Sequence, residues 1–281
     1  MRNLTPFPDQ SFPVFEDAVN RKTDMVSRNV LRMAFPTMRI RFAEYDQLFV
    51  ANTLETVAIN GVHAGIRADL LGMYSYDNAA ISSLRRHLEQ LQPKSVRYTC
   101  QYCTLETAEE MDHVVGQAEF PEFTMHPKNL IPACSKCNRN KGQYWRVNNV
   151  KNILNLYLDT LPQVHYLFLD VNIDQFNDLD FSFRLNHDPS ISVGLWSLLQ
   201  RHFTKLDLLQ RMKKEAIKNL TEFQVRIRNQ VAVGQSVADI TQVTLSTAAD
   251  IRQNYGANYW KAVFEEGLVN SVHFWNTLNQ N

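Results

Sequence analysis

The sequence predicts an α+β protein that is mostly helical, with a small cysteine-bracketed module between two helical regions. Apolar residues recur at helical spacing in the first 95 residues and again around 204–229. Residues 97–142 are instead turn-rich and bracketed by two Cys-x-x-Cys pairs. We therefore expect an N-terminal, mostly helical region at 1–95, the module at 96–150, and a C-terminal, mostly helical region at 151–281.

The composition is that of a folded chain. A length of 281 residues is too long for a bare zinc module and enough for one large domain or two smaller ones. Hydrophobic residues make up 44%, which is too many for general disorder. No apolar run approaches the roughly 20 residues that span a bilayer. The N-terminal MRNLTPFPDQSFPVF lacks the apolar stretch of a signal peptide, so we expect a cytoplasmic protein.

The charge is balanced overall but unevenly placed. The formal net charge is zero, so no global basic field points to a nucleic-acid partner. Between Phe123 and Leu158, however, there is no Asp or Glu. The cations in this stretch are Lys128, Lys136, Arg139, Lys141, Arg146 and Lys151. Such a local basic face is able to hold phosphates, although charge alone is equally typical of a solvated surface.

The N-terminal region is expected to hold three helices after an irregular arm. The first 35 residues are rich in Pro and Phe, which favours irregular structure. From Thr37 to Val57 the apolar residues are spaced for one face of a helix. Glycines at 61 and 65 break that pattern, and Ile66–Met73 and Asn78–Leu91 predict the next two helices.

The module and the C-terminal region contain the predicted strands. Glu110–Val115 and Leu130–Ala133 are short enough for strands, and Ser135–Gly142 predicts a helix that stops at its glycine. Tyr166–Ile173 and Phe181–Leu185 predict two further strands. The longest helix is expected from Thr204 to about Asn229, and the tail from Val237 is expected to be loop and short helices.

All four cysteines fall into the two Cys-x-x-Cys pairs and none is left over. They are Cys100, Cys103, Cys134 and Cys137. Disulfides are a weak explanation in a chain without a secretory signal. Each pair stands on a tight turn and is able to supply two thiolate ligands to one shared ion. This spacing therefore predicts a structural zinc site with four thiolate ligands.

Polar residues between and beside the cysteine pairs suggest a second, catalytic centre. Asp112 and His113 follow one another on the first predicted strand, and Asn138 lies on the predicted helix. If that helix packs on the strand, Asn138 is able to face Asp112. A carboxylate and an amide oxygen suit Mg²⁺, which keeps waters and phosphate oxygens. His113 is then available as a neutral base near pH 7.

The pattern C-x2-C…DH…N…C-x2-C-N-x2-K-G resembles the HNH endonucleases of the zinc-containing ββα-metal type. The stretch EFPEFTMHPKNLIPACSKCNRNKG is similar to a bacterial branch of standalone HNH proteins, and the C-terminal region resembles that branch more loosely. The residues that carry the resemblance are Cys100, Cys103, Asp112, His113, Asn129, Cys134, Cys137, Asn138, Lys141 and Gly142.

The resemblance implies a role for each residue of the motif. Asp112 and Asn138 would hold a catalytic Mg²⁺ or Mn²⁺, and His113 would deprotonate the attacking water. Asn129 would fix the loop and help to orient His113, while the four cysteines would hold a structural zinc. The implied reaction is hydrolysis of DNA phosphodiester bonds to 5′ phosphate and 3′ hydroxyl ends.

The sequence also departs from the family pattern. The proline expected soon after Asp112-His113 is absent, since the chain continues as DHVVGQAEF. The last member of the motif is Asn138 rather than His, and NLYLD stands where a His-Pro-aromatic phrase is expected. These departures keep the core catalytic groups but prevent any transfer of substrate preference.

Four cations flank the predicted metal and are candidate nucleic-acid contacts: Lys128, Arg139, Lys141 and Arg146. Arg139 and Lys141 are alternatively plain helix-end charges. His126 is a further candidate for a phosphate or metal contact, although a lone loop histidine is more often a polar surface residue.

Two questions of function stay open at this point. The cysteines alone are also compatible with a zinc knuckle that binds nucleic acid without cleaving it. The bacterial branch implies an anti-phage defence effector that works beside an ATPase, and the alternative is a standalone restriction-like or mobile-element nuclease. DNA is the expected partner in both settings, and a homo-oligomer is a further candidate.

Overall fold

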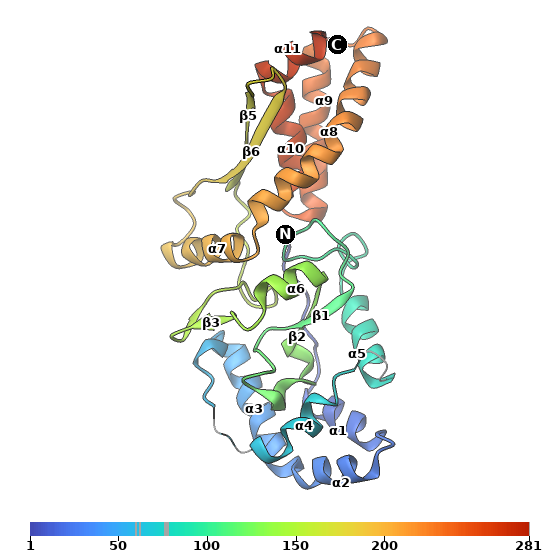
Figure 1. Cartoon of the computed structure of the whole chain (residues 1–281), viewed down its shortest axis with the longest axis vertical. Helices are drawn as coiled ribbons and strands as arrows, with labels where there is room; N and C mark the ends of the chain where they lie inside the picture. The colour runs from blue at the N-terminus through green and yellow to red at the C-terminus, as the bar shows by residue number, and fades with distance from the viewer. Residues whose placement is uncertain (60, 62, 76–78, 281) are drawn as a thin grey trace. The chain divides into compact units, whose positions relative to one another are not determined.

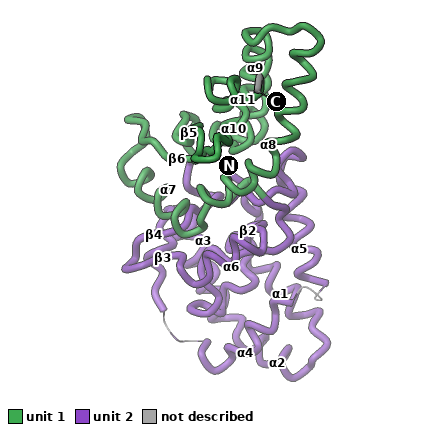
Figure 2. Tube along the Cα trace, turned by 45° about the horizontal axis from the view of Figure 1, so that its top comes forward, with its two compact units in different colours: residues 1–2, 103–105, 161–281 green, residues 3–102, 106–160 purple. Residues whose placement is uncertain are grey.

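The structure is a computed structural model of the whole chain, and it describes all residues except 60, 62, 76–78 and 281 (Figure 1). The described residues form two compact units (Figure 2). The N-terminal unit comprises 3–102 and 106–160, and the C-terminal unit comprises 1–2, 103–105 and 161–281. Helices dominate both, so the α+β, mostly helical class is confirmed. The expected boundaries near residues 95 and 150 stay a prediction.

The N-terminal unit combines helices with two small antiparallel sheets, β1–β2 and β3–β4. Its α-helices are α1 (Phe12–Asn20), α2 (Met25–Met33), α3 (Phe35–Ala51), α4 (Arg67–Leu71), α5 (Ala79–Gln90) and α6 (Ser135–Lys141). Its strands are β1 (Glu110–His113), β2 (Leu130–Ala133), β3 (Arg146–Val147) and β4 (Val150–Lys151). Single 3₁₀ turns occur at Leu54–Thr56, Ala64–Ile66, Pro121–Phe123 and Pro127–Asn129.

The C-terminal unit is a β-hairpin packed against a set of helices. Its elements are β5 (Leu167–Ile173), β6 (Leu179–Leu185), α7 (Val193–Lys205), α8 (Leu208–Ala232), α9 (Val237–Tyr255), α10 (Trp260–Val269) and α11 (Val272–Gln280). The two strands pair antiparallel, with Leu167 opposite Leu185 and Ile173 opposite Leu179. In Figure 1 the hairpin lies alongside α8 and α10, and residues of α8 contact β6 while residues of α10 contact β5. No helix among the described residues is long and apolar enough to cross a membrane.

The prediction of an irregular arm over the first 35 residues is wrong, because α1 and α2 lie there. Pro13 falls in the first turn of α1, where a missing N–H breaks no helical hydrogen bond. Asp24 caps α2 by accepting hydrogen bonds from the backbone N–H groups of Val26 and Ser27. The prolines therefore start helices here rather than prevent them.

The other predicted helices of this unit are confirmed with shifted ends. The helix expected over Thr37–Val57 is α3, which ends when Asn52 takes a left-handed conformation with φ 55°. The segment expected at Ile66–Met73 is a 3₁₀ turn followed by the short helix α4. The third helix predicted for the first 95 residues is α5; its expected first residue, Asn78, lies outside the described residues.

In the C-terminal unit both predicted strands are confirmed, but the helices begin and end at other residues than predicted. The helix expected from Thr204 is α8, which begins only at Leu208 because Asp207 takes a left-handed conformation with φ 54°. The preceding helix α7 was not predicted. The tail expected as loop and short helices instead begins with the long helix α9, capped by Ser236, whose hydroxyl accepts from the N–H of Asp239.

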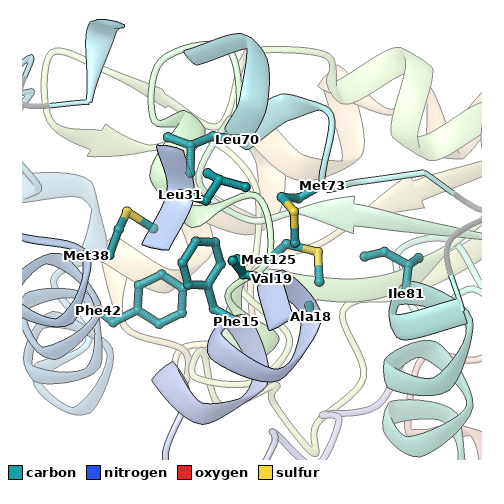
Figure 3. Close-up of a cluster of buried hydrophobic side chains, with 10 residues drawn as sticks. All are labelled: Phe15, Ala18, Val19, Leu31, Met38, Phe42, Leu70, Met73, Ile81 and Met125. Carbon is teal, nitrogen blue, oxygen red and sulfur yellow. The ribbon is translucent and has the colours of Figure 1, made fainter. Parts of the chain in front are cut away.

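The core of the N-terminal unit joins its helices to the cysteine-bracketed module (Figure 3). A cluster of buried apolar side chains consists of Phe15, Ala18, Val19, Leu31, Met38, Phe42, Leu70, Met73, Ile81 and Met125. Only Met125 comes from the module, and Figure 3 shows it among side chains of the first helices. A second cluster packs Met111 and Leu130 of the β1–β2 hairpin against Leu84 and Leu88 of α5. The hairpin thus depends on the helices before it for its apolar cover.

Candidate active site

The predicted strand–strand–helix arrangement is present. β1 and β2 pair antiparallel, with Asp112 opposite Ile131 and His113 opposite Leu130. α6 follows β2 directly and contacts β1 (Figure 1). The first strand ends at His113, two residues earlier than predicted, and the chain then turns into the loop that leads to β2. Asp112 and His113 therefore stand at the end of a strand covered by a short helix.

The four cysteines lie together as the spacing predicts. Their Sγ atoms are all within 4.8 Å of one another, and all four residues are buried. None of them forms a disulfide. Cys134 also caps α6, since its Sγ accepts from the N–H of Cys137, and the Sγ of Cys103 accepts from the N–H of Leu105.

This cluster fits a structural zinc. Tetrahedral zinc with Zn–S bonds of about 2.3 Å separates its sulfur ligands by roughly 3.8 Å, which is compatible with the observed grouping. Four buried thiols without another ligand type form a closed site of the structural kind. The hydrogen bonds from backbone N–H groups to sulfur favour thiolates, the form that binds metal.

Asp112 is buried, and both of its carboxylate oxygens have partners. The hydroxyl of Tyr102 donates to Oδ2 at 2.9 Å, and Nζ of Lys141 donates to Oδ1 at 2.9 Å. Burial raises the pKa of Asp112 above its usual value, and the Lys141 ammonium group opposes that shift. Burial and the nearby Asp112 also raise the pKa of Tyr102, so its hydroxyl keeps the proton that it donates.

Lys141 is itself buried, although it stands near the end of a short helix. Only 2% of its side chain is exposed, against 3% for Asp112, so the ion pair is shielded from water. Its ammonium group also donates to the backbone carbonyl of His113. A lysine is rarely buried this deeply unless it is paired. Lys141 therefore ties α6 to the end of β1 and does not point to solvent, as a phosphate contact would.

His113 is oriented by one hydrogen bond to the loop that follows it. Its Nε2 lies 3.0 Å from the carbonyl oxygen of Thr124, and a carbonyl oxygen only accepts. We infer that the proton is on Nε2 and that Nδ1 carries the free lone pair. Burial lowers the pKa of His113 to about 4, so the imidazole is neutral at pH 7. The ring of Tyr74 packs edge-on against it, with centroids 4.6 Å apart.

Asn129 is the hydrogen-bonding centre of that loop. Its Nδ2 donates to the carbonyls of Val115 and Phe123, at 3.1 and 3.0 Å. Its Oδ1 accepts from the N–H of Val115 and from the hydroxyl of Tyr45, at 2.7 and 3.0 Å. Because Phe123 directly precedes Thr124, these bonds also fix the carbonyl that orients His113. The side chain is fully buried and touches the loop rather than open space.

Asn138 is partly buried on α6, and its hydrogen bond goes to a residue that the sequence did not single out. Its Nδ2 donates to a carboxylate oxygen of Glu110 at 2.7 Å. Glu110 stands two residues before Asp112 on β1, so both side chains lie on the same face of the strand. The alternation of side chains along a strand was the sequence signal that could have identified Glu110 as a neighbour of Asp112. No comparable local signal pointed to Tyr45 or Tyr102.

The four predicted nucleic-acid contacts lie in different environments. Lys128 forms an ion pair with Asp46 at 2.9 Å. Arg146 donates to the backbone carbonyls of Glu55 and Val57, and forms an ion pair with Glu119. Arg139 is exposed on α6. With Lys141 buried, Arg139 is the member of this set that faces solvent without an ion pair to a described residue.

His126 lies inside the N-terminal unit and not on its surface. Its ring packs against those of Tyr45 and Phe42, with centroids 4.0 and 4.6 Å apart. The side chain is fully buried, and burial lowers its pKa well below the usual value. A neutral ring in an aromatic cluster has no access to a phosphate. The structure therefore gives His126 a core position.

Asp112 and Asn138 carry atoms that suit a catalytic metal, but in this structure their side chains bond to Lys141 and Glu110 instead. A carboxylate and an amide oxygen are ligands that Mg²⁺ accepts. The Asp112 oxygens, however, already accept from Tyr102 and from Lys141. In the described part of the chain, the four cysteines are the only group of three or more His, Cys, Asp or Glu side chains whose ligand atoms lie close enough together to hold a metal ion. A divalent ion thus does not fit Asp112 while Lys141 occupies it.

Comparison with known proteins agrees with this geometry. Residues 100–143, from the first cysteine to just past α6, match the family model of the HNH endonucleases. The chain therefore contains an HNH endonuclease domain at these positions. Protein ea31 of Escherichia phage lambda is 26% identical over 187 residues, which cover 62% of this chain and 62% of the phage protein. No solved structure matches the chain.

Proposed function

We propose that this protein is an endonuclease that hydrolyses DNA phosphodiester bonds with His113 as its general base. The observation that carries the proposal is the hydrogen bond from Nε2 of His113 to the Thr124 carbonyl, inside the HNH domain. That bond holds the ring with Nδ1 as a proton acceptor, as a general base requires. A zinc knuckle that only binds nucleic acid has no need of an oriented, neutral imidazole.

The proposed reaction moves one proton to His113. Nδ1 accepts a proton from a water molecule while the water oxygen attacks the phosphorus. The bond from phosphorus to the 3′ oxygen breaks and that oxygen takes a proton from solvent water, which leaves a 5′ phosphate and a 3′ hydroxyl, the products that the family implies. A pKa of about 4 keeps Nδ1 unprotonated at neutral pH. General-base catalysis of this kind contributes about 10²- to 10⁴-fold.

A divalent metal, Mg²⁺ or Mn²⁺, would supply charge stabilisation at the phosphate when bound. The family resemblance assigns it to Asp112 and Asn138. That assignment requires Lys141 to leave the Asp112 carboxylate, because the ammonium group is the present partner of Oδ1. Asn129 is assigned to holding the loop and not to contact with substrate. The four cysteines are assigned to a structural zinc.

Plasmid cleavage tests the proposal. Purified protein is incubated with supercoiled plasmid and Mg²⁺ or Mn²⁺, and nicked and linear products are separated on a gel. We expect wild-type protein to cleave and His113→Ala to lose cleavage by about 10²-fold or more. His273→Ala, which changes an exposed histidine, is the matched control. Zinc content and circular dichroism establish that both variants are folded. If neither wild-type protein nor His113→Ala cleaves DNA with any metal or DNA form tested, the proposal of an enzyme is rejected.

A non-cleaving, zinc-dependent nucleic-acid-binding protein is the second candidate function. The observation that favours it is the buried ion pair between Lys141 and Asp112, which fills the carboxylate that a catalytic metal would need. Under this alternative, DNA binding depends on zinc and is unchanged in His113→Ala. Gel-shift assays on the same two proteins therefore separate the two functions.

The exposed Arg139 on α6 is the best-supported contact to the DNA backbone among the four predicted cations. For the biological setting we propose an anti-phage effector in the cytoplasm that works with an ATPase. A standalone restriction-like or mobile-element nuclease is the alternative. Co-purification distinguishes them, because a stable complex with a tagged ATPase supports the first and a freely active monomer or homo-oligomer supports the second.

A further inference from the structure

Arg41 is buried on α3, and its guanidinium group reaches the loop between β1 and β2. Only 3% of its side chain is exposed, and 7% of that of its partner Glu122, so water does not screen the ion pair. Nε and Nη2 of Arg41 both donate to Oε1 of Glu122, at 3.0 and 2.8 Å. Nη2 also donates to the carbonyl of Ala58 at 3.1 Å, and Nη1 donates to a carboxylate oxygen of Glu44. A buried guanidinium group needs such a full set of partners, because an uncompensated buried charge is strongly destabilising.

Glu122 lies in the 3₁₀ turn Pro121–Phe123, which leads directly to the carbonyl that orients His113. The next residue is Thr124, whose hydroxyl donates back to the first carbonyl of the turn at 2.7 Å. The carbonyl oxygen of Thr124 lies 3.0 Å from Nε2 of His113. The position of the turn therefore decides where this acceptor stands relative to the imidazole ring.

Two contacts from outside the turn hold it in place. A single 3₁₀ turn is held only weakly by its own hydrogen bonds, whose geometry is poorer than in an α-helix. Asn129 donates to the Phe123 carbonyl at 3.0 Å. Arg41 binds the Glu122 carboxylate and also lies over the Phe123 ring, 5.0 Å from its centroid. The first contact comes from a residue of the motif, and the second comes from α3, a helix outside the motif that contacts this turn (Figure 1).

We propose that Arg41 is a positioning residue for the general base. Its ion pair with Glu122 places the turn so that the Thr124 carbonyl accepts from Nε2 of His113. This bond leaves Nδ1 as the proton acceptor, whereas without it either ring nitrogen is able to carry the proton. The inference rests on the proposed function, because it takes His113 as the general base. It gives the helices before the motif a part in the reaction as well as in stability.

Substitutions on both sides of the ion pair test the proposal. Arg41→Met alone would leave a buried unpaired carboxylate, so the test variant combines Arg41→Met with Glu122→Gln and removes both charges. Glu122→Gln alone is the conservative variant, because its amide oxygen is able to accept from both Arg41 donors. Arg39→Met is the matched control, since Arg39 lies on the same helix but pairs near the surface with Glu16. Zinc content and circular dichroism establish that each protein is folded.

Nitrogen-15 NMR of the histidine side chains reports the tautomer of His113 and needs no cleavage. The His113→Gln protein, which lacks these signals, assigns them. In wild-type protein at neutral pH we expect a single neutral tautomer with the proton on Nε2. The double variant should lose this single pattern and show exchange between both tautomers, while Glu122→Gln and Arg39→Met should keep it. The proposal is overturned if the folded, zinc-loaded double variant keeps the wild-type pattern.

Arg41→Lys covers the case in which the double variant does not fold. It keeps a buried positive charge, but its single ammonium group replaces the planar, two-point contact of the guanidinium group with Glu122. We expect the same loss of the single tautomer in this variant. A wild-type pattern in Arg41→Lys would then overturn the proposal.

Single-turnover cleavage separates positioning from DNA binding. With protein in saturating excess over DNA, we expect the double variant to cleave about tenfold to 100-fold more slowly than wild type, because small misplacements of a catalytic group have effects of this size. Its DNA affinity should stay unchanged. A loss of affinity with an unchanged rate overturns the proposal. If the tautomer changes as expected and wild-type protein does not cleave, only the nuclease proposal fails; if wild-type protein cleaves and the tautomer does not change, only this inference fails.

Discussion

The hydroxyl of Tyr45 on α3 donates to Oδ1 of Asn129 at 3.0 Å, which links an N-terminal helix to the loop that orients His113. The two residues are 84 positions apart, and both are fully buried. Arg41, one turn earlier on α3, pairs with Glu122 of the same loop at 2.8 Å. The first helices are thus part of the support of the candidate active site.

Removal of the Tyr45 hydroxyl should loosen this support. Tyr45→Phe keeps the ring packing, and Asn129 still accepts from the Val115 N–H, so we expect a loss of about 1 kcal/mol in the free energy of unfolding. Cleavage should fall severalfold while zinc content stays full. Urea denaturation and plasmid cleavage measure the two effects. Tyr98→Phe, at an exposed tyrosine, is the control and should change neither. A Tyr45→Phe protein with wild-type stability would contradict the supporting role.

Loss of one cysteine should release the zinc. Cys134 is both a proposed ligand and the cap of α6, so Cys134→Ser should lose the metal and loosen the helix that carries Asn138 and Lys141. We expect a fall in zinc stoichiometry and a clearly lower melting temperature, because binding of a structural zinc is folding free energy. Metal analysis and thermal unfolding are the measurements, with Ser135→Ala as the neighbouring control. Full zinc content and unchanged stability in Cys134→Ser would show that the cluster is not a zinc clamp.

The buried His113 should make stability depend on pH. Its pKa is about 4 in the folded chain and about 6.5 when unfolded, so the unfolded state binds more protons between these values. Stability is therefore fully present above about pH 6.5 and falls as the pH drops toward 4, by on the order of 3 kcal/mol from this group. His113→Gln does not titrate and should flatten that part of the profile. Urea denaturation at several pH values compares the two proteins, and parallel profiles would rule out the effect.

Two cations near the site should behave differently toward DNA. Arg139→Gln removes an exposed charge, so we expect weaker binding to DNA of any sequence and a salt dependence reduced by about one charge. Lys128→Gln instead breaks the ion pair with Asp46 and should lower stability more than DNA affinity. Binding titrations over a range of salt concentrations, with unfolding curves, test both. Equal losses of affinity in the two variants would mean that Lys128 also contacts DNA.

The cysteines and the strand–strand–helix order could be predicted because their signals are local. Two Cys-x-x-Cys pairs, a short strand with Asp112 and His113, and a helix start after Cys134 are each contained in a few consecutive residues. The partners of these residues could not be predicted in the same way. Lys141 reaches Asp112 across 29 positions, and nothing in its residue type indicates burial. The prolines near the N-terminus were misleading, because a proline in the first turn of a helix and a proline in a loop look alike in sequence.

The position of Met125 in the first hydrophobic cluster bears on how such a domain is inherited. If residues 100–143 were transplanted alone into another protein, Met125 would lose the side chains of α1, α2 and α3 that bury it, and Met111 and Leu130 would lose α5. The smallest exchangeable cassette is therefore close to the whole N-terminal unit. A transplanted motif would need the helices before the cysteines to keep these apolar side chains out of water.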